Sequence, residues 1–394
     1  RSHRAPSGPA LHQSDRPQNR MNAATQLLRE LVARPSINPA FVDDPAVSGE
    51  ERVAELLIDH ARKAGLDIRR QAVLPGRKNL LVRLAPAGKV QRRIIFAPHL
   101  DVVPAEDRQF KPVIKNGRLH GRGACDTKGS VATFFHSLCE VARSGSRPNH
   151  TELLFVGLVD EECNQAGSRK FAQAGPKGDL AIAGEPTMLQ TVTAHKGDLW
   201  WRLTAQGKAA HGATPHLGKN AIHTMARVVD VLETEYAKLL RQRSHPLLGS
   251  PTCNVGVIRG GTQPNIVPEQ AWIDIDRRTL PGETATGVWR EIRTLLNRHR
   301  LKIDHTDLKG VDSPALETDP QLPLVQEFLR ASRRRKTLGV HYFTDAAPIT
   351  SGGTPAIVFG PGNIAQAHTA DEWLDLKQLD QAVAIVTRFL RAQP

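Results

Sequence analysis

The chain reads Ile94-Ile95-Phe96-Ala97-Pro98-His99-Leu100-Asp101 at the point that decides its fold. An uninterrupted apolar run of this length is typical of a strand that is buried on both faces, as in a parallel sheet covered by helices. A histidine and an aspartate follow directly where the strand ends. In open α/β sheets, ligands collect beyond the carboxyl ends of the strands, so we expect a functional site here.

The same unit occurs three more times along the chain. Apolar residues 153–159 precede Asp160-Glu161-Glu162, residues 180–184 precede Glu185, and residues 356–359 lead through a Gly-Pro-Gly loop to His368. Because the carboxyl ends of parallel strands meet at one edge of a sheet, we expect these side chains to converge on one crevice. Predicted helices alternate with these strands, which indicates a mostly parallel α/β sheet. The predicted helices are residues 23–33, 51–64, 129–142, 168–174, 322–332 and 376–390.

A second pattern interrupts this alternation. Between 192 and 306 the predicted order is β-α-β-β-α-β, which is the split ferredoxin-like arrangement. We therefore expect an inserted domain at 192–306, with the first domain formed by 21–191 and completed by 307–394. Residues 1–20 contain three Pro, four Arg and almost no large apolar side chain, which predicts a disordered tail.

Composition limits the possible function classes. The 394 residues carry a formal net charge of +13 and four scattered cysteines. So few cysteines argue against a disulfide framework and favour a reducing compartment, which we take to be the cytoplasm. No apolar run is long enough to predict a membrane-spanning helix. The densest basic cluster, 333–336, has no recognition motif or interleaved aromatic residues, so we expect no nucleic-acid partner.

The acidic and histidine residues form a pattern that suits a divalent cation. His99 and Asp101 lie on the same face of an extended segment. Asp126 lies in a glycine-rich loop, and clustered carboxylates repel one another unless a cation neutralises them. Imidazole together with carboxylate suits zinc, cobalt or manganese better than magnesium or calcium. The adjacent Glu161 and Glu162 allow one carboxylate to bind metal while the other acts as a general base.

Taken in order, the motifs resemble those of the co-catalytic zinc hydrolases that include acetylornithine deacetylase, succinyl-diaminopimelate desuccinylase, aminoacylase and glutamate carboxypeptidase. The resemblance extends from about Ala23 to the C-terminus. It rests on the His-Leu-Asp-Val-Val-Pro string at 99–104, the Gly-Arg-Gly-Ala-Cys-Asp-Thr-Lys-Gly loop at 121–129, Asp-Glu-Glu at 160–162, Gly-Glu-Pro-Thr at 184–187, Gly-Lys-Ala-Ala-His-Gly at 207–212, Gly-Thr-Gln-Pro-Asn at 261–265, Asp-Arg-Arg-Thr-Leu-Pro at 276–281 and Ala-His-Thr at 367–369.

The resemblance implies a role for each matching residue of the catalytic domain. His99 and Glu185 would bind one metal ion, Glu162 and His368 would bind a second, and Asp126 would bridge the two. Glu161 would be the general base, and Asp101 would be the carboxylate behind His99. The implied cofactor is a pair of divalent ions, zinc first, with cobalt or manganese as alternatives.

In the inserted domain, the resemblance implies a lid that also forms a homodimer. His211 matches the histidine that family dimers donate across the subunit interface, and Arg278 and Asn265 match residues that hold the substrate carboxylate. Arg277 beside Arg278 leaves that assignment open. The expected activity is hydrolysis of the amide bond of an N-acyl amino acid. A carboxypeptidase or dipeptidase of the same family is the alternative. The sequence has neither a Gly-x-Ser-x-Gly elbow nor a His-Glu-x-x-His helix.

Overall fold

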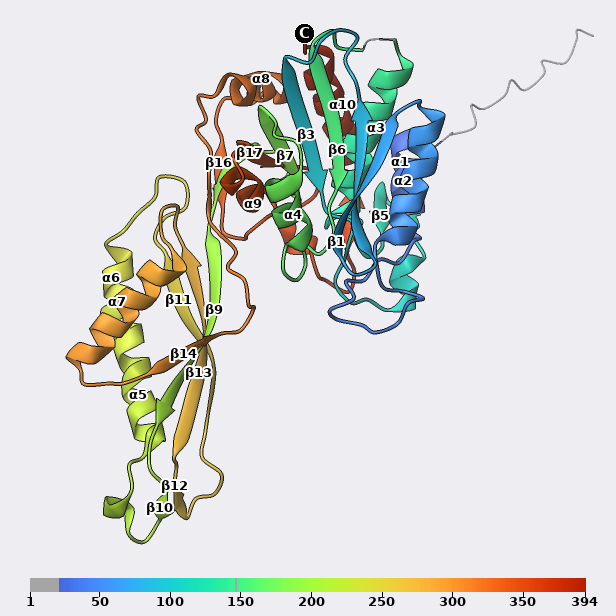
Figure 1. The fold of residues 1–394 in the computed structure, drawn as a ribbon. Helices are drawn as coiled ribbons and strands as arrows, with labels where there is room; N and C mark the ends of the chain where they lie inside the picture. Colours follow the sequence, from blue (N-terminus) through green and yellow to red (C-terminus); the bar gives the residue numbers. More distant parts are fainter. Residues whose placement is uncertain (1–20, 146) are drawn as a thin grey trace, which may run out of the picture.

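A computed structural model describes residues 21–145 and 147–394, and it places them in two lobes (Figure 1). The tail predicted at 1–20 lies outside the described residues. One lobe contains the large sheet with its covering helices, and the other contains a smaller antiparallel sheet with helices on one side. Separate clusters of buried apolar side chains stabilise the two lobes.

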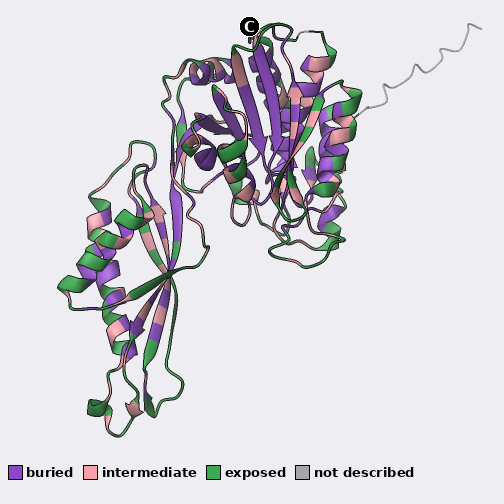
Figure 2. Cartoon of the chain, viewed as in Figure 1, coloured by how far each residue is buried: buried purple, intermediate pink, exposed green. Residues whose placement is uncertain are grey.

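The large sheet follows the order β1-β2-β6-β3-β7-β17-β8-β15, with β16 also paired to β8. Its central strands β6, β3, β7 and β17 run parallel, and antiparallel strands flank them. The mostly parallel sheet predicted from the apolar runs is confirmed, and Figure 2 shows its central strands buried. The strands are β1 Asp67–Leu74, β2 Arg77–Leu84, β3 Arg92–Pro98, β6 Thr151–Gly157, β7 Leu180–Gly184, β8 Val192–His195, β15 Leu316–Glu317, β16 Leu338–Val340 and β17 Ala356–Phe359.

Helices cover both faces of this sheet, which explains why its central strands lack polar alternation. Ile94 and Phe96 of β3 pack into the cluster formed with α1, α2, α3, α8 and α10. Ile95 and Ala97 face the opposite way, toward the cluster that includes residues of α4 and α9. The helices are α1 Ala23–Val32, α2 Glu51–Lys63, α3 Lys128–Arg143, α4 Ala166–Ala174, α8 Pro323–Ser332, α9 Ala346–Ser351 and α10 Leu376–Arg391.

A small antiparallel sheet lies beside the glycine-rich loop that carries Asp126. It has the order β18-β5-β4 and joins a late segment of the chain to an early one. Its strands of three residues are too short to show a hydrophobic period, so the sequence did not predict them. The strands are β4 Val113–Lys115, β5 Arg118–His120 and β18 Trp373–Asp375, with the short 3₁₀ turns η1 Asp107–Phe110 and η4 Ile364–Gln366 nearby in the chain.

The second lobe has the predicted β-α-β-β-α-β order, and its sheet runs β11-β13-β9-β14. The first helical segment of this lobe contains a π-helical stretch, η3, that separates α5 from α6. At the far end of this lobe a two-residue ladder pairs β10 with β12. The elements are β9 Gly197–Gln206, β10 Ala210–His211, η2 Pro215–Leu217, α5 Ala221–Val231, η3 Leu232–Tyr236, α6 Ala237–Arg241, β11 Thr252–Gly260, β12 Ile266–Val267, β13 Gln270–Thr279, α7 Ala285–Arg298 and β14 Asp304–Asp307.

The connection between the lobes begins slightly later than the boundary predicted at 192. Strand β8, Val192–His195, pairs with β15, β16 and β17 of the large sheet. The chain then enters the second sheet at Gly197, the first residue of β9. Residues 192–195 are Val-Thr-Ala-His, a composition that does not distinguish the two sheets, so only strand pairing assigns them. No helix of the described residues is both long and apolar enough to cross a membrane.

Candidate metal centre

The predicted site residues of the first lobe follow the carboxyl ends of the parallel strands. His99 comes directly after β3 and Glu185 directly after β7. Glu161 and Glu162 follow β6, and His368 follows β17 after a longer loop. Side chains from all four strand ends lie within ion-pair distance of one another or of Asp126, so the four strand ends meet at one place, as the sequence predicted.

Asp126 lies between the two histidines. Its Oδ1 atom is 3.2 Å from His99 Nε2, and its Oδ2 atom is 3.4 Å from His368 Nε2. His368 Nε2 also lies 3.1 Å from Glu162 Oε2, and His99 Nε2 lies 3.8 Å from Glu185 Oε1. Each oxygen of one carboxylate thus faces a different His–Glu pair, which is the arrangement that a carboxylate bridging two cations requires.

Glu161 belongs to the same cluster. Possible metal-binding atoms of His99, Glu161 and Glu185, one from each side chain, lie within 4.8 Å of one another. The same is true of His99, Asp126 and Glu162. Glu162 has one buried carboxylate oxygen, Oε1, without a hydrogen-bond partner among the described residues. A buried acceptor left unpaired is costly, so this oxygen is available for a ligand bond.

The electrostatics of the cluster fit a missing positive charge. Burial raises the pKa of Glu162 to about 7, helped by the charge of Asp126. Burial also raises the pKa of Glu161 and of Glu185 well above the usual range for a glutamate. Hydrogen bonds with Asp126 and Glu162 raise the pKa of His368 to about 10. Without a cation, protons on these glutamates and on His368 offset the charge of the cluster, and divalent cations bound by deprotonated ligands would replace those protons.

Asp101 holds the backbone of the two glutamates. Its Oδ1 accepts a hydrogen bond from the amide of Glu161, and its Oδ2 accepts one from the amide of Glu162, both at 3.1 Å. Asn38 donates to Oδ2 as well, at 2.8 Å. His99 Nδ1 is 3.0 Å from the Asp101 carbonyl oxygen and 3.6 Å from its carboxylate. Asp101 therefore lies beside the imidazole of His99, and its carboxylate holds the backbone of both glutamates.

Glu372 is a site residue that the sequence did not reveal. Its carboxylate is 1 % exposed and accepts hydrogen bonds from the amides of Gly123, Cys125 and Asp126 at 2.9, 2.8 and 3.0 Å. It also pairs with the guanidinium of Arg122 at 2.7 Å. Glu372 thus fixes the loop that presents Asp126. Its only sequence signal is its position four residues after His368.

The predicted residues of the second lobe do not reach this cluster within one chain. His211 lies in β10 opposite Ile266 of β12, at the end of the lobe farthest from the large sheet (Figure 1). Asn265 is adjacent, since its carbonyl oxygen accepts a hydrogen bond from the amide of Gly212 at 2.7 Å. The His211 side chain is exposed. Any role at a metal centre therefore needs a second copy of the chain or a large movement.

Arg278 lies at the other end of the same lobe. In the pairing of β13 with β9, Arg278 is opposite Asp198, and the next pair includes Gly197, where the chain enters this lobe from the first one. Its guanidinium forms two hydrogen bonds with Asp276, at 2.8 and 2.9 Å. Arg277 is fully buried and bound to Glu283 at 2.8 Å. Arg277 is thus a core residue of the lobe, and Arg278 is the arginine with an accessible fork.

Comparison with known proteins agrees with this fold and cluster. Residues 95–392 match the family described as Peptidase family M20/M25/M40. Acetylornithine deacetylase from Vibrio atlanticus (strain LGP32) is 30% identical over 380 residues, which are 93% of this chain and 97% of that protein. A tripeptidase from Staphylococcus aureus has a TM-score of 0.76 at 19% identity, over 93% of this chain and 97% of its own. A dinuclear metal binding peptidase of the M20 family from Bacillus subtilis has a TM-score of 0.68 at 13% identity, over 93% and 96%.

A mostly parallel sheet with histidines and carboxylates gathered at its carboxyl edge defines the class of the protein as a metallohydrolase. The chain belongs to peptidase family M20/M25/M40. It is an enzyme that hydrolyses amide bonds, related to acetylornithine deacetylases and to peptidases.

Proposed function

We propose that the enzyme removes the acyl group from an N-acyl amino acid at a centre of two divalent cations. The observation that carries this proposal is the placement of Asp126, whose two oxygens face His99 on one side and His368 on the other. Acetylornithine deacetylases are the curated relatives at 30% identity, which supports a deacylase before a peptidase.

The residues present fit such a centre. His99 and Glu185 would hold one cation, His368 and Glu162 the other, and Asp126 both. The mixed imidazole and carboxylate donors suit zinc, with cobalt or manganese as alternatives. Bound there, the cations would lower the pKa of a water molecule and polarise the amide carbonyl.

Glu161 is the proposed general base. Its backbone is fixed by Asp101, and its carboxylate lies in the cluster without being one of the predicted ligands. Burial raises its pKa well above the usual range, and a raised pKa favours proton transfer near neutral pH. Glu161 would accept the proton of the attacking water and deliver it to the leaving amine.

Three residues of the second lobe complete the proposed site. The exposed His211 would be donated by the partner subunit of a homodimer to the carbonyl oxygen as negative charge develops there. Arg278 would bind the substrate carboxylate, for which its guanidinium fork is suited. Asn265 lies beside His211, so Asn265 of the partner subunit would bind this carboxylate together with Arg278. Arg278 would then exchange its present partner Asp276 for the substrate.

A dipeptidase or carboxypeptidase activity is the second candidate, because the solved structures with this fold include a tripeptidase and an M20 peptidase. Turnover of the zinc- or cobalt-loaded enzyme should be measured on N-acetylornithine, N-succinyl-diaminopimelate, other N-acyl amino acids and dipeptides. The proposal predicts a kcat/KM highest for one N-acyl amino acid. A preference for dipeptides would favour the second candidate, and no amide hydrolysis on any of them would contradict both.

We also propose that the enzyme works in the cytoplasm. The four cysteines, Cys125, Cys139, Cys163 and Cys253, are free thiols, and two of them are buried. Free thiols persist where the compartment is reducing.

A further inference from the structure

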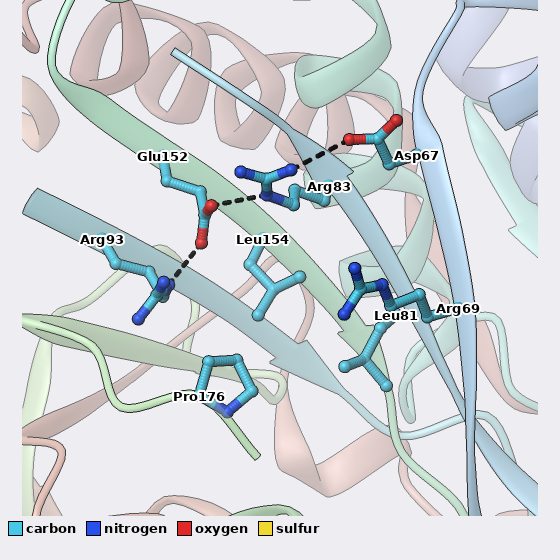
Figure 3. A pocket seen from close by; sticks show the side chains of 8 residues that line it. All are labelled: Asp67, Arg69, Leu81, Arg83, Arg93, Glu152, Leu154 and Pro176. Atoms are coloured by element: carbon cyan, nitrogen blue, oxygen red, sulfur yellow. Dashed lines mark hydrogen bonds and ion pairs between the residues drawn. The ribbon is translucent and has the colours of Figure 1, made fainter. Parts of the chain in front are cut away.

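A second cavity lies on the large sheet, away from the metal centre. It has a volume of about 340 Å³ and is lined by Asp67, Arg69, Leu81, Arg83, Arg93, Glu152, Leu154 and Pro176 (Figure 3). Arg93 and Glu152 stand at the beginnings of β3 and β6, whereas His99 and Glu161 follow the opposite ends of these strands. Six residues of extended chain separate Arg93 from His99, or about 20 Å at 3.3 Å per residue.

The cavity carries more positive than negative charge. Glu152, whose side chain is 5 % exposed, accepts a hydrogen bond from Arg83 at 2.5 Å and is also paired with Arg93. Arg83 pairs in addition with Asp67 at 3.1 Å. Two guanidinium groups thus share two carboxylates, and that of Arg69 has no carboxylate partner in the described part of the chain.

The wall between these arginines is apolar. Figure 3 shows Arg93 on one side of Leu154 and Arg69 with Leu81 on the other, with Pro176 below Leu154. Leu81 and Leu154 lie on the face of the large sheet whose central part is covered by α4 and α9. The cavity therefore lies at the edge of the area that these two helices cover. A volume near 300 Å³ is at the small end of small-molecule sites, and this cavity combines three apolar residues with five charged ones.

We propose that this cavity binds a small organic oxyanion with a short apolar body. The carboxylate or phosphate of the ligand would bind the fork of Arg69, which offers parallel N–H donors to such a group. The apolar body would lie on Leu81 and Leu154. Arg83 and Arg93 are held in place by Glu152, so little side-chain entropy is lost when a ligand binds beside them. The small volume favours a metabolite over a segment of another protein.

The test is calorimetric titration of the metal-loaded enzyme with hexanoate, hexyl phosphate and hexylamine. Three variants are compared with wild type: Arg69→Gln, Arg69→Lys, and Arg62→Gln as the control. Arg62 is an exposed arginine of α2, and its one ion pair within the described residues is with Asp59 at 3.3 Å. Thermal unfolding of each variant checks that it folds, which the exposure of Arg69 leads us to expect.

We expect hexanoate or hexyl phosphate to bind wild type and Arg62→Gln equally, and hexylamine to bind neither. Whichever anion binds more tightly identifies the ligand as a carboxylate or a phosphate. Arg69→Gln should weaken that binding about tenfold, which is about 1.4 kcal/mol, and Arg69→Lys should weaken it less. Anion binding that is unchanged in Arg69→Gln would belong to the metal centre and would overturn the proposal. The absence of binding at millimolar concentrations would also overturn it. Neither result bears on the proposed hydrolysis.

Discussion

Glu372 provides the most informative perturbation of the loop that carries Asp126. Both of its oxygens accept hydrogen bonds from donors: Oε2 from Arg122 and the amide of Gly123, and Oε1 from the amides of Cys125 and Asp126. The variant Glu372→Gln keeps the shape but replaces one acceptor by an NH₂ group. That group would face N–H donors on whichever side it lay. The variant also leaves the buried guanidinium of Arg122 without its counter-charge.

The expected cost follows from these contacts. Breaking a buried ion pair by removing one charge costs about 3–5 kcal/mol, and this range includes the lost hydrogen bonds. Part of that cost can be relieved if the loop moves, and movement of the loop displaces Asp126. Loss of a group that orients metal ligands typically lowers metal affinity by about 10–100-fold. We therefore expect Glu372→Gln to weaken zinc binding by a factor in this range, as measured by competition with a chromophoric chelator.

Glu283→Gln is the matched control. Glu283 also accepts from two arginines, Arg277 and Arg243, and from the amide of Leu280, at 2.7–2.8 Å. It lies in the second lobe, so its replacement should lower the unfolding temperature without changing zinc affinity. If both variants, measured well below their unfolding temperatures, bind zinc as tightly as wild type, Glu372 does not position Asp126.

Three further predictions address pH, the dimer and the orientation of the glutamates. Burial lowers the pKa of His195 to about 4. As the pH falls below about 6.5, His195 is therefore protonated in the unfolded chain before it is protonated in the folded one. Between pH 7 and pH 4, the unfolding free energy of metal-free wild type should fall by about 3 kcal/mol more than that of His195→Phe, as measured by urea titration. Equal losses in the two proteins would contradict a buried neutral ring. His211→Ala should be inactive alone, but mixing it with an equal amount of Glu161→Ala should restore about a quarter of wild-type turnover. About half of the dimers are then mixed, and each mixed dimer has one intact site out of two. No recovery of activity after confirmed subunit exchange would contradict donation of His211 across a dimer. Asp101→Asn places an NH₂ group against N–H donors and should lower kcat by about 10–100-fold; unchanged turnover would show that Asp101 does not orient the glutamates.

Much of the first lobe follows from its sequence because its strands are buried on both faces. The run Ile94–Ala97 has no polar residue, since helices cover both sides of β3. A polar side chain that directly follows such a run must lie at the edge of the sheet. Because of this physical constraint, the sequence alone predicts that His99 and Glu185 lie near each other.

Other features could not be predicted, for reasons that lie in the chain itself. Strands of three residues such as β18 have no measurable period, so the sequence does not indicate that Glu372 neighbours the Asp126 loop. Contacts such as that between Asn38 and Asp101 depend on tertiary packing between distant segments. The residues of β8 fall inside the predicted inserted domain because the composition of a four-residue strand does not tell which sheet it joins.

The most direct test of the proposed mechanism is the metal content and turnover of Glu161→Ala. Glu161 is predicted to move a proton and not to hold a cation, so the variant should retain two metal ions per chain by elemental analysis. Its kcat on the best N-acyl amino acid should fall by about 10²–10⁴-fold. Near-wild-type turnover would contradict the role of Glu161 as general base, and loss of one metal ion would instead make Glu161 a ligand.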